Sequence, residues 1–284
     1  RARWGVVRKS TKRLFSHGSF RLGFAFFFLI VFLAIFADLI APYSPNKNDF
    51  RNLFSPPSLD HWFGTDGYGR DILSRVIHGT RVSLRIGLAV VTLNAVFGIL
   101  IGVAAGYIRI LDNLMMRVMD GLMAFPGVLL AIALAAVLGP SEFNAVIALT
   151  VTFTPRTARI VRASVLVIRE MPYVEAARAV GANHARLIFR YILPNSLSPL
   201  IVQLTFVFAV SILAEAILSF LGVGPPPPAP SLGNIIAEGR NYLREAVWIA
   251  LFPGVVIASA VLGLNLMGDG LRDVFDPRMA ETRT

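Results

Sequence analysis

Apolar residues gather in six long runs, and polar and basic residues fill the segments between them. The runs lie near residues 21–42, 82–108, 118–138, 143–165, 197–222 and 246–268. A helix needs about 20 mostly apolar residues to cross the hydrocarbon core of a bilayer. The pattern therefore predicts an all-α, polytopic membrane protein with about six transmembrane helices.

The first run is the clearest span, and the fourth is the shortest. Residues 22–41 are dense in Phe and Ile, and only Asp38, near the end, interrupts them. In the fourth run the apolar stretch ends at residue 154, and Pro155 and Arg156 follow directly. We interpret it as a helix that leaves the membrane early and carries an arginine-rich face into the cytoplasm. The alternative, a buried helix that never crosses, would leave an odd number of crossings.

The basic residues between the runs predict an orientation. Those before the first run have no acidic residue among them: Arg1, Arg3, Arg8, Lys9, Lys12, Arg13 and Arg21. Cytoplasmic loops carry an excess of Lys and Arg, so the N-terminus is expected in the cytoplasm, as is the arginine-rich segment 156–190. Segments 43–81 and 223–245 then lie outside. Six crossings return the C-terminus to the cytoplasm.

These features divide the chain into five parts. They are a cytoplasmic basic arm at 1–20, a first transmembrane helix at 21–42, an extracytoplasmic segment with an amphipathic helix at 43–81, a membrane core at 82–271 and a cytoplasmic tail at 272–284.

Composition supports a membrane protein and excludes several other classes. The chain is 55% hydrophobic and 15% charged, whereas soluble domains are about 25% charged. The net charge of +10 does not indicate nucleic acid, which requires a basic face on a soluble domain. Cysteine is absent, which excludes disulfides and Cys-ligated metal sites.

The membrane runs lack the groups that an enzyme would need. All four histidines lie outside the runs, and no carboxylate pair or histidine cluster lies within them. A phosphate-binding loop places a lysine after a glycine, and none of Lys9, Lys12 and Lys47 follows one. We therefore expect no cofactor or metal in this chain and no ATPase of its own, so energy must come from a partner.

One cytoplasmic segment has the composition of a docking hairpin. Alanine-rich sequence favours a helix up to Val180, and Gly181 breaks it or permits a sharp turn. A second short helix at 183–191 would then run to Pro194.

This segment resembles the loop of ABC-importer permeases, which reads E-A-A-x-x-x-G followed by a spacer and I-x-L-P. Tyr191 stands where the motif has Ile, with Ile192 beside it. The matching residues are Glu175, Ala176, Ala177, Gly181, Leu193 and Pro194.

The resemblance implies a type I permease fold, with 82–271 as its core and 172–194 as the loop that docks on an ATP-binding subunit. Glu175 would be a polar contact or a helix cap, Ala176 and Ala177 would permit close approach, and Gly181 would make the turn. ATP and Mg would be bound by the partner subunits. The alternative is an ordinary amphipathic hairpin.

Two further stretches, 61–79 and 267–278, resemble the second permease subunit of peptide and nickel importers. The resemblance implies a bacterial inner-membrane subunit that passes dipeptides or oligopeptides. Its partners would be a related permease subunit, two ATP-binding subunits and an external solute-binding protein. Nickel and glutathione remain alternative substrates. An ion channel or a membrane enzyme is the rival class, and a docking loop argues against a channel.

Charged residues outside the first span form a second candidate site. Asp66, Arg70, Asp71 and Arg75 are three to five residues apart, a spacing that predicts salt bridges along a helix on the outer membrane face. They would be either a solvated, paired surface or part of the rim that receives the binding protein.

Glu215 is the one carboxylate well inside a predicted transmembrane helix. Polar groups in hydrocarbon are costly and mark pathways or contacts between helices. Glu215 would either meet the ammonium group of a passing peptide or bond a neighbouring helix, and we favour the second role.

Overall fold

The computed structural model describes residues 17–275, which fold as an all-helical bundle with no strand among them. The elements are α2 (Gly18–Ile35), α3 (Ala37–Ile40), α4 (Ile72–Tyr107), α5 (Arg109–Met123), α6 (Gly127–Leu138), α7 (Glu142–Ile168), α8 (Pro172–Ala179), α9 (His184–Arg186), the π-helix η1 (Leu187–Ile192), α10 (Leu193–Phe220), α11 (Leu232–Gly239), the 3-10 helix η2 (Arg240–Tyr242) and α12 (Trp248–Phe275).

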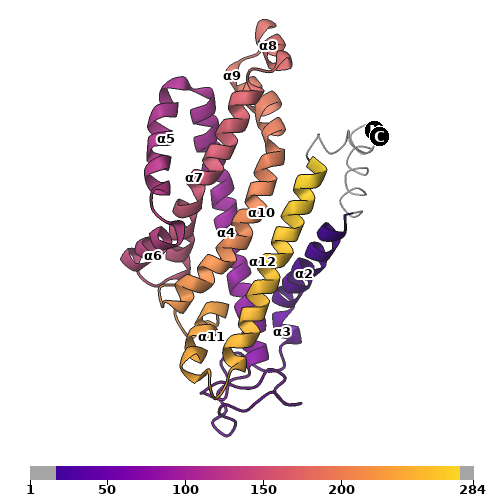
Figure 1. Ribbon diagram of the computed structural model, residues 1–284, viewed down its shortest axis with the longest axis vertical. Helices are drawn as coiled ribbons and strands as arrows, with labels where there is room; N and C mark the ends of the chain where they lie inside the picture. Colours follow the sequence, from indigo (N-terminus) through magenta and orange to yellow (C-terminus); the bar gives the residue numbers. More distant parts are fainter. Residues whose placement is uncertain (1–16, 276–284) are drawn as a thin grey trace.

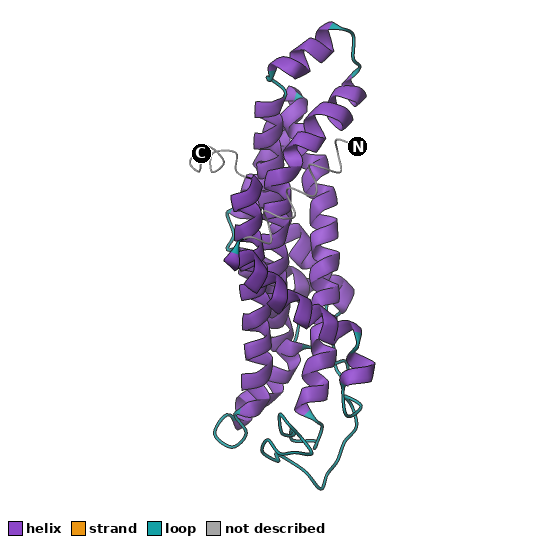
Figure 2. Cartoon of the chain, turned by 90° about the vertical axis from the view of Figure 1, so that its right-hand side faces the viewer, coloured by secondary structure: helices purple, strands orange, loops and turns teal. Residues whose placement is uncertain are grey.

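The long helices run side by side along the longest axis of the molecule (Figures 1 and 2). At one end α8 and α9 project beyond the bundle, whereas α11 and the loops after α3 lie at the other end (Figure 1). Helix α2 begins, and α12 ends, toward the α8 end (Figure 1). The two ends of the described chain therefore lie toward the same end of the bundle.

Four helices are long and apolar enough to cross a membrane: α2, α4, α12 and the continuous helix 184–220. They correspond to the first, second, fifth and sixth predicted spans. The third predicted span, 118–138, is wrong as a single helix, because α5 and α6 meet at 89° across a short break. Pro126 explains the break, since proline lacks an amide donor and pushes the preceding Phe125 out of helical geometry.

The fourth run forms a single 27-residue helix, α7, that keeps Pro155 within it. It packs most extensively against α4, where Gly98, Gly102 and Gly106 bring the two backbones together. A Cβ added at Gly102 would lie 2.6 Å from the Cβ of Val161. Small residues four apart permit such close packing in membranes. The glycine stripe is visible in the sequence, but we did not predict its partner.

The arginines of α7 are neutralised by α5. Asp112 accepts from Arg162 at 2.5 and 2.6 Å, and Asp120 pairs with Arg159. These charges explain why α7 is not among the four apolar helices, although its 27 residues would extend about 40 Å.

The amphipathic helix predicted within 43–81 does not form as a separate element. The chain is irregular from Ala41 to Asp71, and α4 begins at Ile72, ten residues before the predicted core. Gly69 has a φ of +70°, and a Cβ there would lie 1.8 Å from the carbonyl oxygen of Asp49. This backbone conformation is incompatible with a helix through residues 66–71.

Candidate functional site

Helix α8 has one face buried in the molecule and one face exposed at its tip. Val174 and Ala177 are buried in a cluster with residues of α7, η1 and α10, among them Val165 and Ile192. Because residues three apart share a helix face, the rest of the helix surface is left exposed, and it carries Glu175, Ala176 and Arg178.

The turn after α8 requires glycine for its backbone conformation. Gly181 has a φ of +84°, and open space surrounds the position of a Cβ. Its amide donates to Arg178 O, and the amide of Ala182 donates to Ala177 O, both at 3.0 Å. This pair of bonds is a Schellman motif, which ends a helix with a residue in left-handed geometry.

The second half of the hairpin differs from the prediction. Asn183 caps it, since its side chain accepts from the amide of Arg186 at 2.8 Å. The helix that follows does not end at Pro194 but continues from His184 to Phe220. In η1 the amide of Leu193 donates to Ile188 O, five residues back. We attribute the continuity to this wider π-turn, which removes the usual clash and missing bond at a proline.

The hairpin is tied to the end of α4. Tyr107, the last residue of α4, bonds through its hydroxyl to Nδ1 of His184 at 2.6 Å, and the two rings meet edge to face. The hairpin is thus attached to α4 as well as to α7 and α10.

The six motif residues do not form one surface. Glu175, Ala176, Gly181 and Pro194 are exposed, and Leu193 is half-buried. Ala177 is only 8% exposed, so the expected approach of a partner to it is wrong: its small size lets α8 pack on its own hairpin. Glu175 also does not cap α8, because no side chain caps that helix and its carboxylate has no bond to another described residue.

Sequence reasoning missed the apolar part of this tip. Val180 is 85% exposed, Phe189 71% and Tyr173 44%. Exposed apolar patches mark surfaces for contact with a partner protein or a membrane. We define the docking tip as Glu175, Ala176, Arg178, Val180 and Phe189.

The charged residues at the opposite end form a buried cluster rather than a surface helix. Asp66 accepts from Arg70 at 2.7 Å and from Arg75 at 2.5 Å. Glu238 of α11, which the sequence did not suggest, accepts from Arg70 at 2.7 Å and from Arg75 at 2.9 Å. Arg75 is 1% exposed. The predicted salt bridges of Asp66 exist, and Glu238 ties them to a segment that is distant in sequence.

Asp71 has a separate role at the start of α4. Its carboxylate accepts from the amide and hydroxyl of Ser74, at 2.8 and 2.7 Å, and contacts Nδ1 of His61 at 2.9 Å. Asp71 is therefore the N-cap of α4 and is 2% exposed.

Glu215 is completely buried between helices. It accepts from the hydroxyl of Ser83 on α4 and from that of Ser219 on α10, both at 2.6 Å. These contacts agree with the favoured structural role. A carboxylate enclosed in this way does not meet a passing solute in this conformation.

Two parts of the chain match models of known protein families. Residues 96–281 match the family described as binding-protein-dependent transport system inner membrane component, and residues 5–57 match the N-terminal TM domain of oligopeptide transport permease C. The first match covers well over half of the chain.

Curated relatives match along almost the whole chain. A putative peptide transport system permease protein of Brucella abortus is 54% identical over 95% of this chain and 91% of its own length. The di/tripeptide transport system permease protein DppC of Pseudomonas aeruginosa is 44% identical, covering 93% and 90%. The glutathione transport system permease protein GsiD of Escherichia coli is 44% identical, covering 89% and 84%.

A solved structure shares the fold. A crystal structure titled as an amino acid ABC transporter with histidines aligns with a TM-score of 0.54 at 20% identity, covering 72% of this chain and 94% of that one.

Proposed function

The chain belongs to the family of binding-protein-dependent transport system inner membrane components, and we propose that it is the permease subunit of a peptide importer, paired with a second homologous permease subunit. The peptide substrate is supported by relatives named for peptides, dipeptides and di/tripeptides. Glutathione, itself a peptide, is the alternative, because permeases named for it are 41–44% identical.

The docking tip carries the second part of the proposal, that two ATP-binding subunits drive transport and bind the ATP and Mg. Glu175 lies on the exposed face of a helix that projects beyond the bundle (Figure 1). Val180 and Phe189 are exposed apolar residues of the same hairpin. A groove in an ATP-binding subunit would bury this apolar surface and give the Glu175 carboxylate a partner.

Motion of the docking tip would reach the membrane through three contacts. Val174 and Ala177 pack α8 against α7 and the helix 184–220. His184, the first residue of that helix, bonds to Tyr107 at the end of α4. A displacement of α8 by an ATP-binding subunit would therefore move these helices together.

The α8 end faces the cytoplasm in this proposal, together with both termini. Arg169, Arg178, Arg186 and Arg190 lie near that end, as the excess of positive charge in cytoplasmic loops requires. The opposite end then faces the external binding protein. The buried ion cluster at that end would stabilise the surface that receives the binding protein rather than contact the binding protein itself. The cluster consists of Asp66, Arg70, Arg75 and Glu238.

Removal of the Glu175 carboxylate tests the docking proposal. Glu175→Ala should lower the amount of ATP-binding subunit that co-purifies and should lower ATP-driven peptide uptake in vesicles. Glu245→Ala, an exposed carboxylate at the opposite end, is the matched control and should not change retention of the ATP-binding subunit. Wild-type retention and uptake in Glu175→Ala would remove Glu175 from the docking contact.

A further inference from the structure

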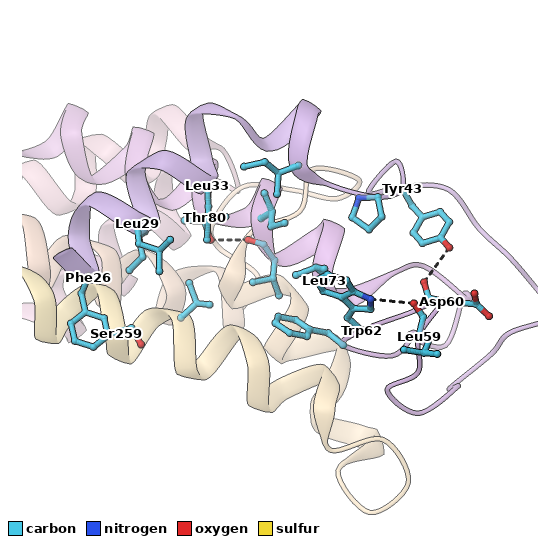
Figure 3. A pocket seen from close by; sticks show the side chains of 17 residues that line it. Phe26, Leu29, Leu33, Tyr43, Leu59, Asp60, Trp62, Leu73, Thr80 and Ser259 are labelled. Carbon is cyan, nitrogen blue, oxygen red and sulfur yellow. Dashed lines mark hydrogen bonds between the residues drawn. The ribbon is translucent and has the colours of Figure 1, made fainter.

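An apolar cavity of about 720 Å³ lies between α2, α4, α12 and the segment that follows α3 (Figure 3). Its volume is within the range of about 300–1,000 Å³ typical of ligand sites. The Thr80 hydroxyl in its wall already donates to Val76 O at 2.7 Å. Most of the remaining wall is aliphatic or aromatic, including Leu29, Leu33 and Val256. Three membrane-length helices line the cavity, so lipid is its surrounding solvent.

The mouth of the cavity has the side chains of a membrane interface. Leu59 is 94% exposed and Trp62 is 67% exposed beside it (Figure 3). A tight turn holds them there, since Nε1 of Trp62 donates to Leu59 O at 3.1 Å. Tyr43 donates its hydroxyl to Asp60 O at 3.1 Å. Trp and Tyr prefer the depth of lipid head groups, which places this mouth at the surface of the leaflet.

A polar pocket of about 210 Å³ adjoins the mouth, and Tyr43 and Asp60 line both spaces. Its other charged groups are Lys47, Asp49, His61 and Asp71. Three carboxylates against one lysine and one histidine favour a cationic guest.

Asp60 is the carboxylate of this pocket that remains available. Asp71 is occupied by Ser74 and His61. Asp49 accepts from the amide of Arg51 and from Asn52, and these bonds hold the pKa of the Asp49 carboxyl below its usual value. Among residues 17–275, the Asp60 carboxylate has no hydrogen-bond or ion-pair partner.

We propose that these two adjoining spaces bind one phosphatidylethanolamine molecule from the leaflet at the end opposite α8. An acyl chain fills the apolar cavity, the ammonium group donates to Asp60, and the phosphate lies toward Lys47. A peptide segment fits less well, because its backbone would leave polar groups unsatisfied in the apolar cavity. A choline head group lacks N–H donors for Asp60. A head group with a net negative charge would be repelled by the carboxylates of the polar pocket.

Lipid retention by the intact assembly tests the head-group contact. The full chain with its partner subunits is placed in nanodiscs of equal phosphatidylethanolamine, phosphatidylcholine and phosphatidylglycerol, and tightly held lipids are identified by native mass spectrometry. We expect selective retention of phosphatidylethanolamine. Asp60→Asn should reduce the selectivity about threefold to tenfold, the size expected for one exposed charge-assisted hydrogen bond. Glu245→Gln, an exposed carboxylate outside both spaces, should leave it unchanged.

Filling the cavity tests the acyl-chain contact independently of Asp60. Leu29→Trp should reduce retention of the bound lipid, whereas Leu100→Trp, at an exposed position on α4 outside the cavity, should not. Equal retention of the three lipids by the wild type would indicate only the surrounding lipid shell and would overturn the proposal. Selectivity unaffected by Asp60→Asn, retention unaffected by Leu29→Trp, or a peptide held in place of lipid would also overturn it.

Discussion

Replacement of Gly181 by valine should uncouple the docking tip from the ATP-binding subunits. The φ of +84° at this position is disfavoured for L-residues and most of all for β-branched ones. Holding valine there costs about 1–3 kcal/mol. No neighbouring atom lies within 4 Å of the added Cβ, so the cost is backbone strain alone and should remain local.

The strain is relieved when the last turn of α8 opens. Opening breaks the bonds from Gly181 to Arg178 and from Ala182 to Ala177. If opening relieves all of the strain, 1–3 kcal/mol corresponds to a roughly 5- to 150-fold shift toward hairpins that cannot dock. The apparent affinity for the ATP-binding subunit is the intrinsic affinity multiplied by the fraction of hairpins that can still dock, so it falls as that fraction falls. Co-purification of that subunit and vesicle uptake measure the effect.

A matched control lies at the end of the bundle opposite α8. Gly222 ends α10 with a φ of +79°, open space at its Cβ position and the same pair of bonds, from Gly222 to Ser219 and from Val223 to Leu218. Gly222→Val therefore imposes the same strain away from the docking tip and should not change retention of the ATP-binding subunit. Gly181→Asn should be tolerated, because asparagine accepts left-handed geometry. Full retention in Gly181→Val, or equal loss in Gly222→Val, would refute this reasoning.

Substitutions at three further positions, each with a control, test buried contacts. Glu215→Gln should assemble normally, whereas Glu215→Leu should lower thermal stability by leaving two buried serine hydroxyls unsatisfied at about 1–3 kcal/mol each; normal assembly of Glu215→Gln with transport lost would show that the charge itself is needed. Gly102→Leu should separate α4 from α7 and prevent stable insertion, measured by protease resistance in membranes, while Gly121→Leu, in open space, should insert normally. Arg75→Ala should destabilise the protein near the lower end of about 3–5 kcal/mol, because Arg70 still pairs with Asp66, whereas the exposed Arg85→Ala should cost about 1 kcal/mol or less in thermal unfolding.

The sequence predicted helices wherever the apolar pattern was long and uniform. Spans two and six and the turn at Gly181 follow from run length and from the unique conformational freedom of glycine. It misplaced elements where one residue competes with the pattern. Pro126 splits a run whose average apolarity reads as one span, and the π-turn at Leu187–Ile192 carries a helix through Pro194, where a proline normally ends one.

The candidate sites were predicted less well, because local spacing does not show which distant residues will meet. Asp66 and Arg70 read as neighbours on one helix, yet their cluster is completed by Glu238, far along the chain. The motif marked Ala177 but not Val180, since a motif does not distinguish a residue that packs inward from one that points outward. The orientation of α8 became visible only with its buried face.

Helix α4 is fixed at both ends and along its last third. Arg75 in its first turn is held by the ion cluster, Tyr107 at its last residue bonds the hairpin, and the glycine stripe joins it to α7. Its 36 residues extend about 54 Å. A rod clamped in this way cannot slide along its axis or bend without breaking a contact, so it is suited to act as a lever arm. A displacement of the hairpin should then tilt α4 and α7 as one rigid unit, so that the opposite end of α4 moves together with the hairpin.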